Sequence, residues 1–195
     1  MIKPWKKVRS RPLADLRLFT ARCDEKISPR TGQPHEFIVL DSADWVNVVA
    51  VTRDEQLVMV EQFRHGSNTV ELEIPGGLIE HAGESPVKAG LRELREETGY
   101  DGRPATLLYK ALPNPAFLNN RCYTVLVRNC ELKHPVEWDH GEDLVTKLVP
   151  IREIPELIES GRIRHSIIIA ALYLFELWQR RQGKRAGRKV KKNAE

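Results

Sequence analysis

Hydrophobic residues, many of them β-branched, dominate two segments of the chain, 46–51 and 57–63. This pattern is typical of half-buried strands, and the polar pair Asp54-Glu55 between them predicts that the two strands are neighbours joined by a turn. A second pair of strands is predicted at 17–22 and 36–40, around the turn at residues 29–32. Shorter apolar runs predict further strands at 70–74, 106–111, 122–127 and 144–149.

Helical signals interrupt this series of strands once and then follow it. Residues 86–98 are predicted as a helix, with Ser85 as its N-cap, Pro86 at its first position and Gly99 as its terminator. Two more helices are predicted at 151–160 and from 166 to about 180. The fold class is therefore α+β, an α/β/α sandwich with a mixed β-sheet between helices and an N-terminal antiparallel strand segment.

The composition indicates one globular domain. The chain has 195 residues, of which 41% are hydrophobic. No apolar run follows the basic N-terminus, and the apolar stretch 166–178 is too short to span a bilayer, so we expect neither a secretory signal nor a membrane segment. The three cysteines lack the spacing of a metal site, which favours reduced thiols and a cytoplasmic location.

The net charge of +4 is concentrated at the C-terminus. Residues 180–192 read RRQGKRAGRKVKK and contain no acid, whereas the rest of the chain is slightly acidic. We interpret residues 181–195 as a basic, disordered tail. Contact with nucleic acid or with an anionic membrane is the alternative, and it is not favoured.

The predicted helix 86–98 carries the candidate chemistry. Glu93 and Glu97, four residues apart, lie side by side, and Glu96 lies on their flank near Arg92. An ordinary solvated acidic face is one interpretation. A Mg²⁺ site is the other, because Mg²⁺ prefers carboxylate oxygens together with substrate phosphates. The apolar stripe that should face the core is a different face of the helix, formed by Val87, Leu91, Leu94 and Thr98.

The same segment resembles a known family. The pattern Glu84-x7-Arg92-Glu93-Leu94-x-Glu96-Glu97-x-Gly99-Tyr100 looks like the second part of the Nudix box, and the chain from about 45 to 178 also resembles that family. One residue is added between Gly77 and Glu84, within the loop 79–83. The helix register is intact, so the addition affects the geometry of the loop.

The resemblance implies a set of metal ligands. Glu93 and Glu97 would bind Mg²⁺, with Mn²⁺ as an alternative metal and Glu96 as a third carboxylate. Arg92 would orient these glutamates and belongs, with Glu96, among the catalytic candidates. The set is completed by the carbonyl oxygen of Gly76 and by Glu84 as a supporting ligand or loop anchor.

Other segments resemble the branch that hydrolyses ADP-ribose and nucleoside-diphosphate sugars: 62–64 (QFR), 72–77 (LEIPGG) and 141–144 (GEDL), with Pro115 near the place of an ADP-ribose marker. Residues 119–121 (NNR) stand where many ADP-ribose enzymes have an acid, which leaves room for another sugar nucleotide. The expected function is Mg²⁺-dependent hydrolysis of a pyrophosphate bond in ADP-ribose, GDP-mannose or a similar substrate, giving a nucleoside monophosphate and a sugar phosphate. The alternatives are a nucleoside-triphosphate or oxidised-nucleotide hydrolase, and a non-catalytic Nudix module that binds RNA.

Further residues are candidates for catalysis or substrate binding. Glu142, in a polar loop, would be the base or another metal ligand, and His140 is a second candidate there. Arg64 is a candidate phosphate clamp, because a guanidinium group matches phosphate oxygens. Trp45 and Arg121 are candidates for substrate contact, as are Phe117 and Tyr123 for stacking. Surface charge and core packing are the competing interpretations of these residues.

The N-terminal strands, within 12–40, resemble a segment that related enzymes pack across a two-fold dimer. We therefore expect a homodimer, although the segment could instead fold back on its own subunit. The expected organisation is a dimerisation segment at 1–44, a Nudix hydrolase domain at 45–180 and the tail at 181–195.

Overall fold

The computed structural model describes residues 1–80, 83–138, 140–141 and 143–192. The chain divides into two compact units, one made of Met1–Asp44 and Ala111–Cys122, the other of Trp45–Lys110 and Tyr123–Glu195. The boundaries of the predicted dimerisation segment (1–44), hydrolase domain (45–180) and tail (181–195) stay predictions.

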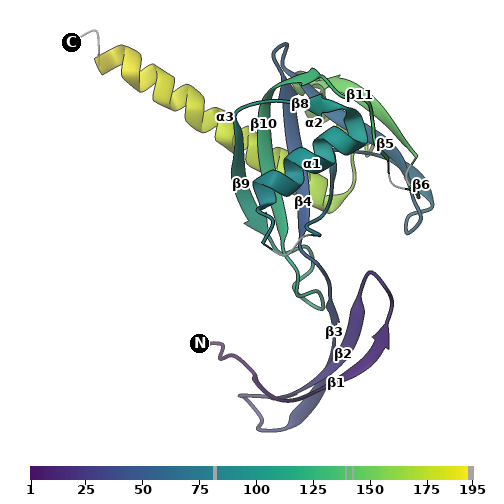
Figure 1. The fold of residues 1–195 in the computed structure, drawn as a ribbon. Coiled ribbons are helices and arrows are strands. Elements are labelled where there is room, and N and C mark those ends of the chain that lie inside the picture. Colours follow the sequence, from purple (N-terminus) through teal and green to yellow (C-terminus); the bar gives the residue numbers. More distant parts are fainter. Residues whose placement is uncertain (81–82, 139, 142, 193–195) are drawn as a thin grey trace. The chain divides into compact units, whose positions relative to one another are not determined.

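The first unit contains a three-stranded antiparallel sheet (Figure 1) formed by β1 (Lys6–Asp15), β2 (Thr20–Ile27) and β3 (Pro34–Asp41), with β2 in the centre. The backbone N–H of Leu40 also bonds to the carbonyl of Phe117, at 2.8 Å. Strand β1 was not predicted, because all ten of its residues are exposed and its sequence shows no apolar alternation. Strand β2 begins later than predicted because Arg17 has a left-handed backbone, with φ of 66°.

The second unit is built on the predicted strands. Its sheet has the order β11 (Leu144–Pro150), β5 (Gln56–Arg64), β4 (Trp45–Thr52), β10 (Cys122–Leu132) and β8 (Tyr100–Asp101). Three strands pair beside this path: β6 (Thr69–Glu73) with β5, β7 (Gly76–Leu78) with β4, and β9 (Ala105–Ala111) with β10. Strands β7 and β8 were not predicted, because two or three residues are too few to show a periodic pattern.

Helices cover both faces of this sheet (Figure 1). Val48 packs in one core beneath α1 (Pro86–Thr98), whereas its neighbour Val49 packs in the other, beneath α2 (Ile154–Glu159) and α3 (Ser166–Lys192). A short 3₁₀ helix, η1 (Ile151–Glu153), precedes α2. Because successive residues of a strand face opposite sides, one strand serves both cores. The predicted α/β/α sandwich is confirmed.

Helix α1 begins and ends as the sequence predicted. The side chain of Ser85 accepts a hydrogen bond from the N–H of Lys88 at 3.3 Å, and Pro86 stands at the first turn. Gly99 has φ of 74°, and its N–H bonds to the carbonyl of Arg95 at 2.8 Å. These caps fix the register of the glutamates along the helix.

Helix α3 extends to Lys192, beyond the predicted end near Arg180. The added segment consists largely of Arg, Lys, Gln and Ala, which are good helix formers, and its two glycines do not interrupt the helix. Among the described residues, no helix has both the length and the apolar character needed to cross a membrane.

Candidate active site

The two helix glutamates lie against the backbone of β7. Glu93 and Glu97 have exposed fractions of 8% and 3%. The N–H of Gly76 donates to Oε2 of Glu97 at 3.1 Å, and a methyl group on Gly77 would come within 2.6 Å of the carboxyl carbon of Glu93. Both carboxylates therefore gather where β7 passes α1.

This arrangement corrects one prediction about α1. The sequence placed the glutamates on a face away from the apolar stripe, yet the buried residues of the helix include both of them beside Leu94 and Gly90. The helix approaches the sheet closely at Gly90, where a methyl group would lie 3.2 Å from Val48. The buried stripe is therefore wider than the apolar pattern indicated, and an ordinary solvated face does not describe these two glutamates.

Two glycines make the close approach between the helix and β7 possible. Strand β7 pairs with β4, with Gly76 opposite Asn47 and Gly77 opposite Val46. A methyl group on Gly76 would lie 2.2 Å from the carbonyl oxygen of Val46, so a larger residue would separate the strands. Gly76 thus keeps the strand pairing, and Gly77 leaves room for a carboxylate.

Arg92 holds the acidic group together. Its guanidinium donates to Oε2 of Glu96 at 3.0 Å, to Oε1 of Glu84 at 3.4 Å and to the carbonyl of Leu78 at 3.0 Å, and it lies 2.9 Å from Oε1 of Glu93. Burial alone would lower the pKa of Arg92, but the carboxylates of Glu93, Glu84 and Glu96 outweigh it and raise that pKa. Arg92 therefore stays charged and offsets the repulsion among these acids.

The loop after β10 is fastened to the end of α1, a contact for which the sequence carries no local signal. The indole Nε1–H of Trp138 donates to the carbonyl of Glu97 at 3.1 Å, and the N–H of Glu137 donates to the carbonyl of Glu96 at 2.8 Å. The last carbonyls of a helix lack partners within it, so the loop satisfies two of them. His140 follows in this loop as an exposed residue, and Glu142 lies outside the described residues.

Arg64, the candidate clamp at the end of β5, forms a two-bond ion pair. Its Nη2 lies 2.6 Å from Oε2 of Glu73 and its Nε lies 3.2 Å from Oε1. The side chain of Glu73 is 2% exposed, whereas that of Arg64 is 42% exposed. Burial by itself would raise the pKa of Glu73, but hydrogen bonds from His165 and Arg64 lower it below its usual value. Glu73 is thus an ionised carboxylate that holds one edge of the guanidinium.

The remaining substrate candidates are less closely grouped. Trp45, half-buried, begins β4 and stands opposite Leu78 of β7. Tyr123 packs beside the core beneath α1. Arg121 belongs to the first unit, where its N–H bonds to Asp44 at 2.8 Å. Phe117 is an exposed residue of the same unit. The structure therefore brings together six of the predicted residues: Gly76, Glu84, Arg92, Glu93, Glu96 and Glu97. Arg121 and Phe117 belong to the other unit.

The comparison with known proteins decides the family. Residues 41–172 match the family model described as NUDIX domain. The chain belongs to the Nudix family. It is similar to an ADP compounds hydrolase of Escherichia coli, with 27% identity over 88% of this chain and 91% of the relative. It is also similar to an ADP-ribose pyrophosphatase of Bacillus subtilis, with 31% identity over 68% of this chain and 71% of the relative.

A solved structure supports the same Nudix fold. The crystal structure of an ADP compounds hydrolase superimposes with a TM-score of 0.82 and 23% identity, covering 94% of this chain and 98% of the other. The chain is thus a Nudix hydrolase, with the fold that the sequence predicted.

Nudix hydrolases generally use a divalent metal ion, and the donor atoms here fit one. Within the described ranges, no three acidic, His or Cys side chains are already arranged as a metal site. However, Oε2 of Glu84 is buried and has no hydrogen-bond partner among the described residues. This oxygen, and the carboxylates of Glu93 and Glu97, are the hard oxygen ligands that such a cation prefers.

Proposed function

We propose that this Nudix hydrolase cleaves the pyrophosphate bond of a nucleoside diphosphate sugar, such as ADP-ribose or GDP-mannose, giving a nucleoside monophosphate and a sugar phosphate. The observation that carries this proposal is the pair of buried carboxylates, Glu93 and Glu97, held against the glycine backbone of β7. Two buried acids at this spacing are unfavourable unless a cation compensates them. Arg92 supplies positive charge beside Glu93, and a metal bound by both carboxylates would add to it.

Mg²⁺ is the proposed metal, with Mn²⁺ as a substitute. Glu93, Glu97 and the carbonyl oxygen of Gly76 would hold it, and Glu96 would add a further carboxylate. When bound, the metal would neutralise charge on the phosphoryl oxygens. Arg92 would keep the glutamates aligned, because its fork already contacts Glu84, Glu93 and Glu96.

Arg64 is the proposed clamp on the diphosphate. A guanidinium carries five N–H groups, and Glu73 accepts from two nitrogens, so the Nη1 edge still has donors for phosphate oxygens. The half-exposed side chain can reach a ligand without breaking its pair with Glu73. Trp45 and Arg121 are further proposed contacts for the substrate.

The reaction requires one water molecule. Its oxygen would bond to one phosphorus as the bridging P–O bond breaks, and the second phosphate would leave with the bridging oxygen. The water proton would pass to a carboxylate, for which Glu142 remains our candidate, either as the base or as another metal ligand. The products are then the two monoesters expected from a sugar nucleotide.

The named relatives favour a sugar nucleotide over a nucleoside triphosphate or an RNA ligand, because they are described as acting on ADP compounds and on ADP-ribose. A substrate panel with Mg²⁺ tests this choice. ADP-ribose, GDP-mannose and 8-oxo-dGTP are each incubated with the full chain, and the products are separated by ion-exchange chromatography. We expect a monophosphate and a sugar phosphate from one of the first two. Turnover of 8-oxo-dGTP alone would contradict the proposal.

We also propose a homodimer formed through the three-stranded sheet of the first unit, with the enzyme in the cytoplasm. Several apolar residues of β1 and β3 are exposed there, namely Val8, Leu13, Phe37 and Ile38. A second copy of the chain would cover them. Sedimentation of the full chain should give the mass of two subunits, and Ile38→Lys should weaken the dimer. Val145→Lys, at an exposed position of β11, is the control.

A further inference from the structure

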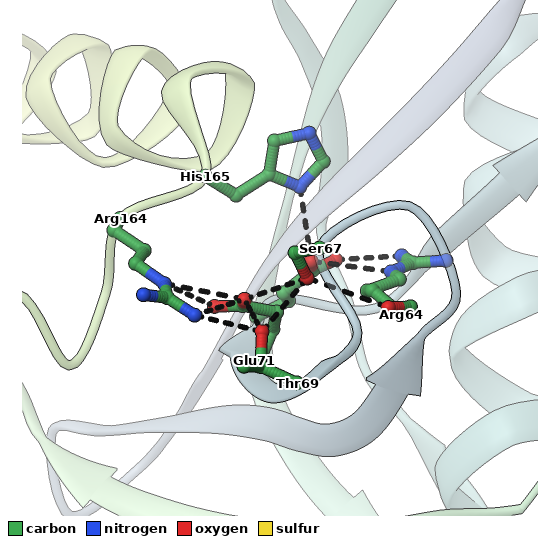
Figure 2. Close-up of polar contacts among 7 residues, drawn as sticks. Arg64, Ser67, Thr69, Glu71, Arg164 and His165 are labelled. Carbon is green, nitrogen blue, oxygen red and sulfur yellow. Dashed lines mark hydrogen bonds and ion pairs between the residues drawn. The ribbon is translucent and has the colours of Figure 1, made fainter.

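A line of polar contacts leads from the start of α3 to the proposed clamp (Figure 2). Nδ1 of His165 lies 3.0 Å from Oε1 of Glu73, and the same oxygen accepts from Nε of Arg64 at 3.2 Å. The second oxygen of Glu73 accepts from Nη2 of Arg64 at 2.6 Å. His165 and Arg64 thus share one buried carboxylate, although 101 positions separate them in the sequence.

The direction of the histidine bond follows from the chemistry of the carboxylate. An ionised carboxylate only accepts hydrogen bonds, so Nδ1 of His165 must carry a proton and donate it toward Glu73. The carboxylate is therefore held by donors from two side chains, His165 and Arg64. These bonds restrict its rotation and fix the plane in which it presents itself to Arg64.

The shorter contact of Arg64 is to Oε2, and its contact with Oε1 is longer. Loss of the histidine would leave Oε1 with this longer bond while the oxygen remains buried. Each added hydrogen-bond donor stabilises a buried carboxylate. The side chain of Glu73 would therefore rotate, either to shorten its bond to Arg64 or to accept a bond from water. Either change moves the Nη1 edge, which is the part of Arg64 available to phosphate.

His165 is not needed to hold the loop before α3 in place, because the neighbouring residue, Arg164, already does this. Arg164 donates from Nη2 to Oε1 of Glu71 and to the hydroxyl of Thr69, both at 2.7 Å, and from Nε to both oxygens of Glu71 (Figure 2). Ser67 and Thr69 also bond to Glu71 and brace the β5–β6 turn. The contact of His165 with Glu73 is therefore separate from the contacts that hold the turn to the loop.

We infer that His165 is a positioning residue, which aligns Arg64 for the substrate diphosphate by holding the Glu73 carboxylate; this inference rests on the clamp role proposed for Arg64. Glu73 lies three residues before Gly76, where the backbone bonds to Glu97. The short segment 73–76 therefore carries both the carboxylate that aligns Arg64 and the backbone group that contacts Glu97. His165, although distant in the sequence, thus sets the orientation of the Arg64 guanidinium toward the diphosphate.

A double-mutant cycle on the full enzyme tests the inference. We would measure KM and kcat for the preferred sugar nucleotide in wild type, Arg64→Ala, His165→Ala and the double variant. Arg64 binds the diphosphate before and during the reaction, so its loss raises KM with little change in kcat. We expect His165→Ala to raise KM about threefold to tenfold, the effect of one weakened hydrogen bond. In the Arg64→Ala background it should change KM by less than about twofold.

Two further variants separate positioning from a structural role. His165→Asn keeps an N–H donor near the place of Nδ1 and should restore KM to within about twofold of wild type. Arg164→Ala removes the neighbouring pair with Glu71 and should leave KM close to wild type while lowering the melting temperature. Far-UV circular dichroism of each variant verifies its fold.

The outcomes are distinct. An equal effect of His165→Ala in both backgrounds would overturn the inference, even if the enzyme hydrolyses sugar nucleotides and Arg64→Ala raises KM. Failure of His165→Asn to restore KM would overturn it too. If Arg64→Ala leaves KM unchanged, or if wild type cleaves none of the sugar nucleotides, the proposed function fails and the inference fails with it.

Discussion

The backbone N–H of Gly76 donates a hydrogen bond to Oε2 of Glu97 across 3.1 Å. This bond joins a strand that pairs with β4 to the last turn of α1, and it fixes one oxygen of a buried carboxylate. This bond involves only Oε2 and leaves the contacts of Oε1 to other groups. The backbone therefore orients the acid that we propose as a metal ligand.

The two neighbouring glycines of β7 should respond differently to alanine. In Gly77→Ala the new methyl group meets the carboxylate of Glu93 at 2.6 Å, the far end of a flexible side chain that can move aside. In Gly76→Ala it meets the carbonyl of Val46 at 2.2 Å, which is backbone. We expect Gly77→Ala to lose activity with little loss of stability, and Gly76→Ala to lose about 1–3 kcal/mol of unfolding free energy. Activity assays and urea unfolding measure both effects.

Gly66→Ala is the control for these two variants, because a methyl group there meets nothing within 4 Å among the residues described. It should keep both activity and stability. If Gly77→Ala remains fully active, the placement of Glu93 against β7 does not matter for the reaction.

Replacement of Arg92 by lysine should damage the site although it keeps the charge. Lysine cannot reproduce the fork that contacts Glu84, Glu96 and Leu78 at once. We expect Arg92→Lys to lower the free energy of unfolding by about 1–3 kcal/mol and kcat by about tenfold. Arg95→Lys, at an exposed position on the same helix, should be close to wild type. Equal behaviour of the two variants in denaturant would contradict the role of the fork.

Acid should weaken the protein partly through Glu71. Hydrogen bonds from Arg164 and Thr69 lower the pKa of this carboxyl from 4.5 to about 2. Because the folded pKa is the lower one, the unfolded chain binds the proton first, so the stabilisation is complete above about pH 4.5 and is lost as the pH falls toward 2. Thermal unfolding between pH 6 and pH 3 should therefore depend less on pH in Glu71→Gln than in wild type.

Glu159→Gln, at an exposed position at the end of α2, is the matched control for that experiment and should follow the wild-type profile. A Glu71→Gln variant with the wild-type slope would show that the pair with Arg164 contributes nothing to acid stability.

The sequence predicted those parts of the fold that local chemistry determines. Ser85, Pro86 and Gly99 mark the ends of α1, and the spacing of Glu93 and Glu97 places them side by side once the helix is fixed. The run of β-branched residues around Val48 and Val49 likewise predicts a strand, and the structure buries that strand on both sides. These signals lie within a few residues of the feature they predict.

Features that depend on partners distant in the chain could not be predicted from the sequence. The bond from Trp138 to Glu97 and the bond from His165 to Glu73 join segments far apart in the chain, and a lone Trp or His carries no sign of its partner. Strand β1 is exposed along its whole length, so it has no apolar pattern. The burial of Glu93 was missed because β7, the three-residue strand that covers it, has no periodicity of its own.

The most direct test of the account is the activity of Glu97→Gln with Mg²⁺ and the preferred sugar nucleotide, measured beside wild type and Glu159→Gln. The substitution keeps the size of the side chain and an oxygen for the Gly76 N–H, so the melting temperature should stay near that of wild type, while kcat falls by about a hundredfold or more. Glu159→Gln should keep its full kcat. A folded Glu97→Gln enzyme with wild-type turnover would contradict the claim that the α1 carboxylates serve the reaction.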